Sequence, residues 1–134
     1  MRFSLFVFIL LFVTASCNRS ALDKHLAGCD SLVITFNYPD TDSVINSIST
    51  TDTKAIQKLK QYIDGKKDTA RQCGFDGNMI FFRDQQQVLP VVFKYSNESC
   101  RQFLYEINNA VSSYSMSNEA ADFLSSLVEG RNWY

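Results

Sequence analysis

Regular alternation of apolar and polar residues within residues 69–116 is the feature that most constrains the fold of this chain. Successive side chains of a β-strand point to opposite faces of a sheet, so alternation is typical of strands with one buried face. Residues 87–95 and 100–107 both alternate in this way. We therefore predict a run of antiparallel strands, with a helix over residues 100–109 as the alternative.

Tight turns separate the predicted strands. Asp76-Gly77 predicts a hairpin between residues 70–75 and 78–83, and Asn108-Asn109 predicts a second tight turn. Pro90 lacks a backbone donor, so we expect the strand that contains it to lie at an edge or to be bulged at that residue.

Two segments have the 3.6-residue period of amphipathic helices. They are residues 51–64, which begin at potential capping residues, and residues 117–129, which begin at Ser117. A further strand is expected over residues 32–38, and a weaker one over residues 44–48. The predicted fold is α+β, an antiparallel β-meander of about four to six strands with two amphipathic helices packed on the sheet.

The N-terminus has the composition of a secretory signal peptide. Arg2 supplies a positive charge, residues 5–13 are apolar, and small residues follow. The apolar run is shorter than the about 20 residues that a transmembrane helix needs. Thr14-Ala15-Ser16-Cys17 resembles a bacterial lipobox, in which small residues precede a cysteine that becomes lipidated. This resemblance implies a lipoprotein that is anchored to a membrane of the cell envelope through Cys17.

On this interpretation the chain has three parts. Residues 1–16 are the signal peptide, residues 17–28 are the lipidated cysteine and a polar tether, and residues 29–134 are one small domain. The single histidine, His25, lies in the predicted tether, where we expect an ordinary surface side chain.

The cysteines distinguish two ways of processing the chain. If Cys17 carries lipid, Cys29, Cys73 and Cys100 remain, which suffices for one disulfide and one thiol. Ordinary cleavage leaves four cysteines and three possible connectivities for two disulfides. Cys73 and Cys100 lie in the same strand-rich block, so we predict a bridge between them, with a pair of buried thiols as the alternative.

Charge and motifs exclude several function classes. The formal charge is −1 at pH 7, without the basic stripe of a nucleic-acid-binding surface. Asp40 and Asp42 form a D-x-D, but the other ligands of a calcium loop are missing, so we interpret it as a turn. No phosphate-binding glycine motif or nucleophile–base arrangement is recognisable, and we expect no enzyme, metal or cofactor.

The remaining expectation is a binding role. Aromatic residues are dense between Phe75 and Tyr114, and an antiparallel sheet with helices on one face leaves its other face open. Either helices cover these aromatic side chains, or some of them receive a protein partner or a hydrophobic ligand. We therefore expect a non-catalytic binding or structural module. The alternatives are an inhibitor of an envelope-directed hydrolase and a secreted protein with two disulfides and no lipid anchor.

Overall fold

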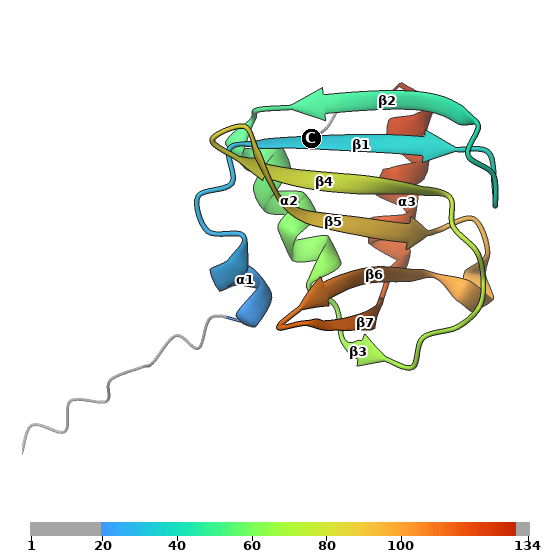
Figure 1. Ribbon diagram of the computed structural model, residues 1–134. Coiled ribbons are helices and arrows are strands. Elements are labelled where there is room, and N and C mark those ends of the chain that lie inside the picture. Colours follow the sequence, from blue (N-terminus) through green and yellow to red (C-terminus); the bar gives the residue numbers. More distant parts are fainter. Residues whose placement is uncertain (1–19, 131–134) are drawn as a thin grey trace, which may run out of the picture.

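The computed structural model describes residues 20–130, which form a seven-stranded antiparallel sheet with helices on one face (Figure 1). The strands are β1 (Ser31–Asn37), β2 (Val44–Thr50), β3 (Lys67–Asp68), β4 (Gly77–Arg83), β5 (Gln86–Lys94), β6 (Gln102–Ile107) and β7 (Ala110–Ser115). Their order across the sheet is β2-β1-β4-β5-β6-β7-β3, and every neighbouring pair is antiparallel. The predicted α+β class is confirmed. The sheet has more strands than the four to six expected, and the additional β3 has only two residues.

Two long helices, α2 (Thr53–Ile63) and α3 (Asn118–Val128), cover the same face of the sheet, as Figure 1 shows. Each begins where the sequence predicts, because a side chain satisfies a free backbone amide of the first turn. Asp52 accepts a hydrogen bond from the amide of Ala55 at 2.9 Å, and Ser117 accepts one from Ala120 at 3.0 Å. The apolar stripes of both helices pack on the sheet and form the core with it.

The predicted tether is wrong over its described part. Residues 21–25 form a short helix, α1 (Ala21–His25), capped by Ser20. Leu22 and Leu26 belong to the hydrophobic core, and the side chain of Leu26 is completely buried. This segment has no long amphipathic period, so its helix depends on burying two leucines against the rest of the domain.

The hairpin predicted at Asp76-Gly77 is also wrong. Residues 69–76, which we call the crossover segment, have no regular secondary structure. They run from β3 at one edge to β4 in the middle of the sheet (Figure 1). Gly77 is the first residue of β4, where an added Cβ would lie 2.2 Å from the carbonyl oxygen of Thr35. Glycine is needed there for close approach of the backbones, not for a turn.

The actual β4–β5 turn is Asp84-Gln85, whose φ angles are 51° and 65°. Positive φ at both central residues is the conformation of a type I′ hairpin turn. The predicted turn at Asn108-Asn109 is confirmed, with φ angles of 55° and 63°. It joins β6 to β7, and β6 excludes the alternative helix over residues 100–109.

Pro90 lies in β5, between β4 and β6, and not in an edge strand. It is paired with Ile80 on the β4 side. On the β6 side the pairing of β5 covers only Val92–Lys94, so Pro90 lies where β5 has separated from β6. The missing N–H of proline therefore removes no ladder hydrogen bond, which is how a proline is tolerated within a sheet.

Candidate functional site

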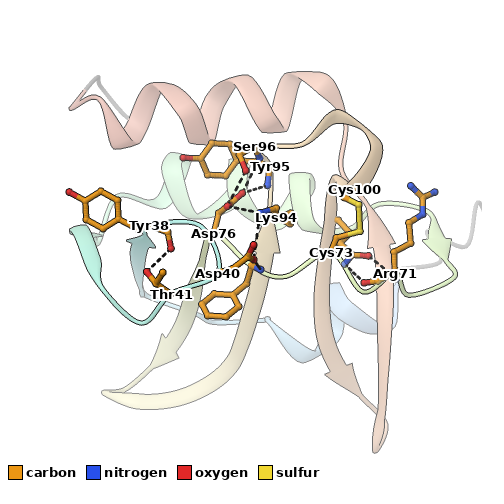
Figure 2. Close-up of polar contacts among 12 residues, drawn as sticks. Tyr38, Asp40, Thr41, Arg71, Cys73, Asp76, Lys94, Tyr95, Ser96 and Cys100 are labelled. Atoms are coloured by element: carbon orange, nitrogen blue, oxygen red, sulfur yellow. Dashed lines mark hydrogen bonds and ion pairs between the residues drawn. A yellow bond between two sulfur atoms is a disulfide. The ribbon is translucent and has the colours of Figure 1, made fainter.

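A disulfide fastens the crossover segment to the sheet. Cys73 of this segment is bonded to Cys100, which ends the short 3-10 helix η1 (Glu98–Cys100) before β6 (Figure 2). The Cα atoms of the two cysteines are 5.8 Å apart. The predicted bridge is therefore present, and it closes the chain across 27 residues.

Side-chain hydrogen bonds support the same attachment. Gln102 of β6 donates from its amide to the carbonyl oxygen of Arg71 at 3.0 Å, and its Oε1 accepts from Ser113 Oγ at 3.0 Å. The guanidinium of Arg71 donates to the carbonyl oxygen of Ser99. Gln102 and Ser113 are both buried. The crossover segment therefore covers the sheet where Gln102 of β6 and Ser113 of β7 lie side by side.

Asp76 ends the crossover segment and is the most fully bonded carboxylate in the described chain (Figure 2). Only 2% of the residue is exposed. Its oxygens accept from the amides of Tyr95 and Ser96 at 2.8 and 2.9 Å, from Ser96 Oγ at 3.1 Å, and from Lys94 Nζ at 3.1 Å. Burial alone would raise the pKa of Asp76, but these hydrogen bonds outweigh it and hold the pKa below its usual value.

Asp40, the first member of the D-x-D, completes this cluster. It lies in the loop between β1 and β2, as the turn interpretation predicts, with φ of 58°. Its carboxylate accepts from the amide of Phe75 at 3.0 Å and lies 3.7 Å from Lys94 Nζ. The β1–β2 loop, the crossover segment and β5 are thus held together by one buried lysine between two carboxylates.

The charged cluster is structural in character. The carboxylate of Asp76 is saturated by protein donors, and Lys94 is buried, with 7% of its side chain exposed. Within residues 20–130, no group of three or more His, Cys, Asp or Glu side chains is arranged to hold a metal ion. Asp40 is exposed to solvent, but its carboxylate is bonded to Phe75 and paired with Lys94, so the cluster holds the crossover segment in place.

His25 lies at the end of α1, and its Nε2 is 3.1 Å from the carbonyl oxygen of Val88. It borders an open hollow of about 350 Å³ whose other lining includes Glu106 and Asn109. Cys29 carries a free thiol, and burial raises its pKa. A thiol nucleophile needs a lowered pKa or an adjacent base, so this arrangement does not favour nucleophilic catalysis. Cys17 lies outside the described residues.

A hollow of about 480 Å³ lies between the end of α2 and the start of α3. Tyr62 donates from its hydroxyl to Glu119 at 3.1 Å there. Burial, together with this hydrogen bond to a carboxylate, raises the pKa of Tyr62 to about 12. The hollow contains one carboxylate and Lys58 at its rim, which is not the pair of convergent carboxylates that acid–base hydrolysis uses.

The open face of the sheet, opposite α2 and α3, is the most distinctive surface of the molecule. Its central side chains are apolar although they are separate from the core. Strand register places them in adjacent positions: Val33 opposite Ile80, Ile80 opposite Pro90, and Val92 opposite Leu104. We call this set, together with two neighbours, the open-face patch; it consists of Val33, Ile80, Phe82, Pro90, Val92, Leu104 and Val111.

The patch is exposed at its centre and at one side. Val92 is 38% exposed and Val111 is 70% exposed, while Ile80, Phe82 and Leu104 are half-buried. Serine, threonine and asparagine side chains border it on the β1 and β2 side. Side chains alternate between the two faces of a strand, which tells us which residues of each strand lie on this face. Two of those residues carry a charge, Glu106 and the buried Lys94, among the residues of β1, β2 and β4–β7.

Most of the aromatic side chains that the sequence singled out belong to the core. Phe81, Phe93, Phe103 and Tyr105 are buried beneath α2 and α3. Phe82 is the aromatic member of the open-face patch. The first expectation, that helices cover these side chains, therefore holds for most of them, and the exposed apolar surface is mainly aliphatic. The sequence does contain a signal for this exposed apolar surface. In β4 and β5 both the odd-numbered and the even-numbered positions include apolar residues, so both faces of these strands are apolar.

Comparison of the chain with models of protein families, with curated proteins and with solved structures found no match. The helices formed by residues 20–130 include none that is long and apolar enough to cross a membrane.

Proposed function

We propose that this chain is an exported, lipid-anchored, non-catalytic binding module of a bacterial envelope, and that it holds a protein partner on its open-face patch. The N-terminal segment and Cys17 support export and anchoring, through their resemblance to a signal peptide and a lipobox. The Cys73–Cys100 disulfide agrees with an oxidising compartment outside the cytoplasm.

The observation that carries the binding role is the open-face patch itself. Large contiguous apolar patches are uncommon on monomeric proteins, and they often mark interaction sites. The patch lies on a rigid sheet whose opposite face is filled by the core, so its side chains are held in fixed positions. A binding surface of this kind needs little ordering when a partner docks.

The chemistry of the patch favours a protein over other partners. Protein interfaces have an apolar centre that is depleted of charge and a polar rim. The patch has aliphatic residues at its centre and hydroxyl and amide side chains at its border. Nucleic acids and anionic lipid surfaces require exposed Lys or Arg. Of the cations on this side, Lys94 is buried between Asp40 and Asp76, and the exposed Arg71 of the crossover segment is paired with Asp68 at 3.4 Å.

Site-specific photo-crosslinking in cells tests this proposal. A photoreactive amino acid replaces Val92 at the centre of the patch in one full-length variant and Lys54 on the exposed side of α2 in a matched control. We expect one protein adduct of defined mass from position 92 and none from position 54. Ile80→Asp, placed in the position-92 variant, is expected to abolish the adduct by putting a charge into the interface.

Two results would contradict a binding role for the patch. One is an equal pattern of adducts from positions 92 and 54, which would indicate random encounters. The other is an adduct that Ile80→Asp leaves unchanged while circular dichroism shows the variant to be folded. Identification of the adduct as a secreted hydrolase would favour an inhibitor over a structural module.

The anchor has its own test. Cys17→Ala is expected to abolish incorporation of a labelled fatty acid and to release the protein from the membrane fraction. Cys29→Ser is the matched control, because Cys29 is a free thiol within the folded domain and its loss leaves the lipidation site intact. Membrane retention of the Cys17→Ala protein without acyl label would show that the lipoprotein interpretation is wrong.

A further inference from the structure

The N-terminal end of the described chain is fixed to the domain. Leu22 and Leu26 of α1 are buried in the core, with 5% and 0% of their surface exposed. Ser20, which caps α1, donates from its hydroxyl to the carboxylate of Asp64 at the end of α2, at 2.9 Å. A further side-chain contact joins the end of α1 to β5. From Ser20 onward, the chain therefore moves with the sheet.

The distance from Cys17 to this fixed segment is short. Two residues, Asn18 and Arg19, separate Cys17 from Ser20. An extended chain spans at most about 3.6 Å per residue, so the Cα atoms of Cys17 and Ser20 can be at most about 11 Å apart. A lipid on Cys17 holds that residue at the bilayer surface. The start of α1 then lies close to the headgroups, because the long tether expected from the sequence is replaced by a packed helix.

The tip of the β6–β7 hairpin lies beside α1. Ala21 and Lys24 of α1 line one hollow together with Asn108 of the hairpin turn. Figure 1 shows α1 and this tip at the same end of the domain, whereas the loop between β1 and β2 lies at the opposite end. The strands therefore run from an end that is attached to Cys17 towards an end that is remote from it.

Charge at the attached end neither strongly attracts nor repels a bilayer. The charged side chains of α1 and the β6–β7 hairpin are Asp23, Lys24 and Glu106. Asp23 lies 3.9 Å from Lys60 Nζ. With His25 neutral, these four charges cancel. The orientation of the domain on a membrane is therefore decided by the short attachment, since polybasic attraction to anionic lipids is missing at α1 and the hairpin.

We propose that the short attachment at α1 orients the domain on the lipid surface, with α1 and the β6–β7 tip against the headgroups and the β1–β2 loop directed away. This inference rests on the proposed lipid anchor at Cys17 and adds a contact surface and a direction to it. The sheet then stands up from the bilayer and presents the open-face patch sideways. Strands of seven residues are about 23 Å long, so a protein that binds the patch meets it close to the membrane.

Fluorescence quenching in vesicles measures this orientation. Ala110→Cys provides a labelling site beside the hairpin tip, and Asp42→Cys provides one in the β1–β2 loop; both residues are exposed. Each variant also carries Cys29→Ser, which removes the free thiol of the domain. The full-length lipidated protein is placed in phosphatidylcholine vesicles that contain a quencher on the lipid headgroup. We expect severalfold stronger quenching of a fluorophore at position 110 than at position 42.

An inserted flexible segment tests whether the short spacer causes the orientation. About ten Gly and Ser residues between Asn18 and Arg19 lengthen the spacer and leave Cys17 and α1 unchanged. We expect quenching at positions 110 and 42 to become nearly equal in this variant.

Three results would overturn the proposed orientation of a protein that carries the lipid. They are equal quenching at the two positions without the insertion, stronger quenching at position 42, and a difference that the insertion leaves unchanged. A protein without labelled fatty acid that does not bind the vesicles would contradict the lipid anchor itself, and this inference with it.

Discussion

Replacement of Asp76 with alanine tests the role assigned to the buried charged cluster. The carboxylate accepts four hydrogen bonds, two of them from the backbone amides of Tyr95 and Ser96. Its removal leaves Lys94 buried with Asp40, 3.7 Å away, as its remaining ion-pair partner. Breaking a buried charge pair by removing one member costs about 3–5 kcal/mol of stability. That is a large part of the 5–15 kcal/mol that stabilises a typical domain.

Lys94→Met is the informative comparison. It keeps most of the apolar volume of the lysine stem, and Asp76 retains three donors from Tyr95 and Ser96. The loss is therefore closer to that of one hydrogen bond to a charged group, about 1.5–3 kcal/mol. We expect the free energy of unfolding to decrease in the order wild type, Lys94→Met, Asp76→Ala.

Urea unfolding at neutral pH, followed by far-ultraviolet circular dichroism, measures these differences. The pH dependence gives a second readout, because the native pKa of Asp76 lies below its unfolded value of about 3.9. Its stabilising contribution is present above the unfolded pKa and is lost as the pH falls through the native pKa. Asp76→Ala should therefore lose less stability on acidification than the wild type. An Asp76→Ala protein within about 1 kcal/mol of the wild type at neutral pH would refute a stabilising role for the cluster.

Two further predictions concern the covalent and helical parts of the fold. Cys73→Ser with Cys100→Ser is expected to lower the free energy of unfolding by about 3 kcal/mol, the chain-entropy value for a loop of 27 residues, as measured by urea titration. Alkylation of both thiols in the unreduced wild type, detected by intact mass, would contradict the bridge. Ser117→Ala removes the cap bond to Ala120 and is expected to cost about 1 kcal/mol. An unchanged thermal midpoint would show that α3 does not depend on this cap.

Local signals predicted the elements that local interactions stabilise. The two long helices begin at capping side chains, and their apolar residues recur with the helical period, so a short window of sequence contains the information. The turn at Asn108-Asn109 is similar, since asparagine tolerates positive φ better than most residues do. The Cys73–Cys100 bridge was predicted from the redox context and the position of both residues in one block.

Local signals failed where a residue serves a distant partner. Asp76-Gly77 has the composition of a hairpin turn, but Asp76 binds groups of residues 94–96, and Gly77 allows close approach to Thr35. Both roles depend on segments that are remote in sequence. α1 was missed for a related reason, because a helix of five residues is stabilised by its tertiary contacts and not by its own propensity.

The sequence by itself determined the α+β class and the two amphipathic helices, and it predicts the pairing of Cys73 with Cys100 and export through its first seventeen residues. Only the tertiary structure decided which apolar side chains lie in the core and which remain on the open face. Alternation assigns side chains to two faces of a strand, but it does not say which face the helices cover. Strand order likewise decided that β2 is a long uncharged edge and β3 a short charged one, because edges exist only once the sheet is assembled.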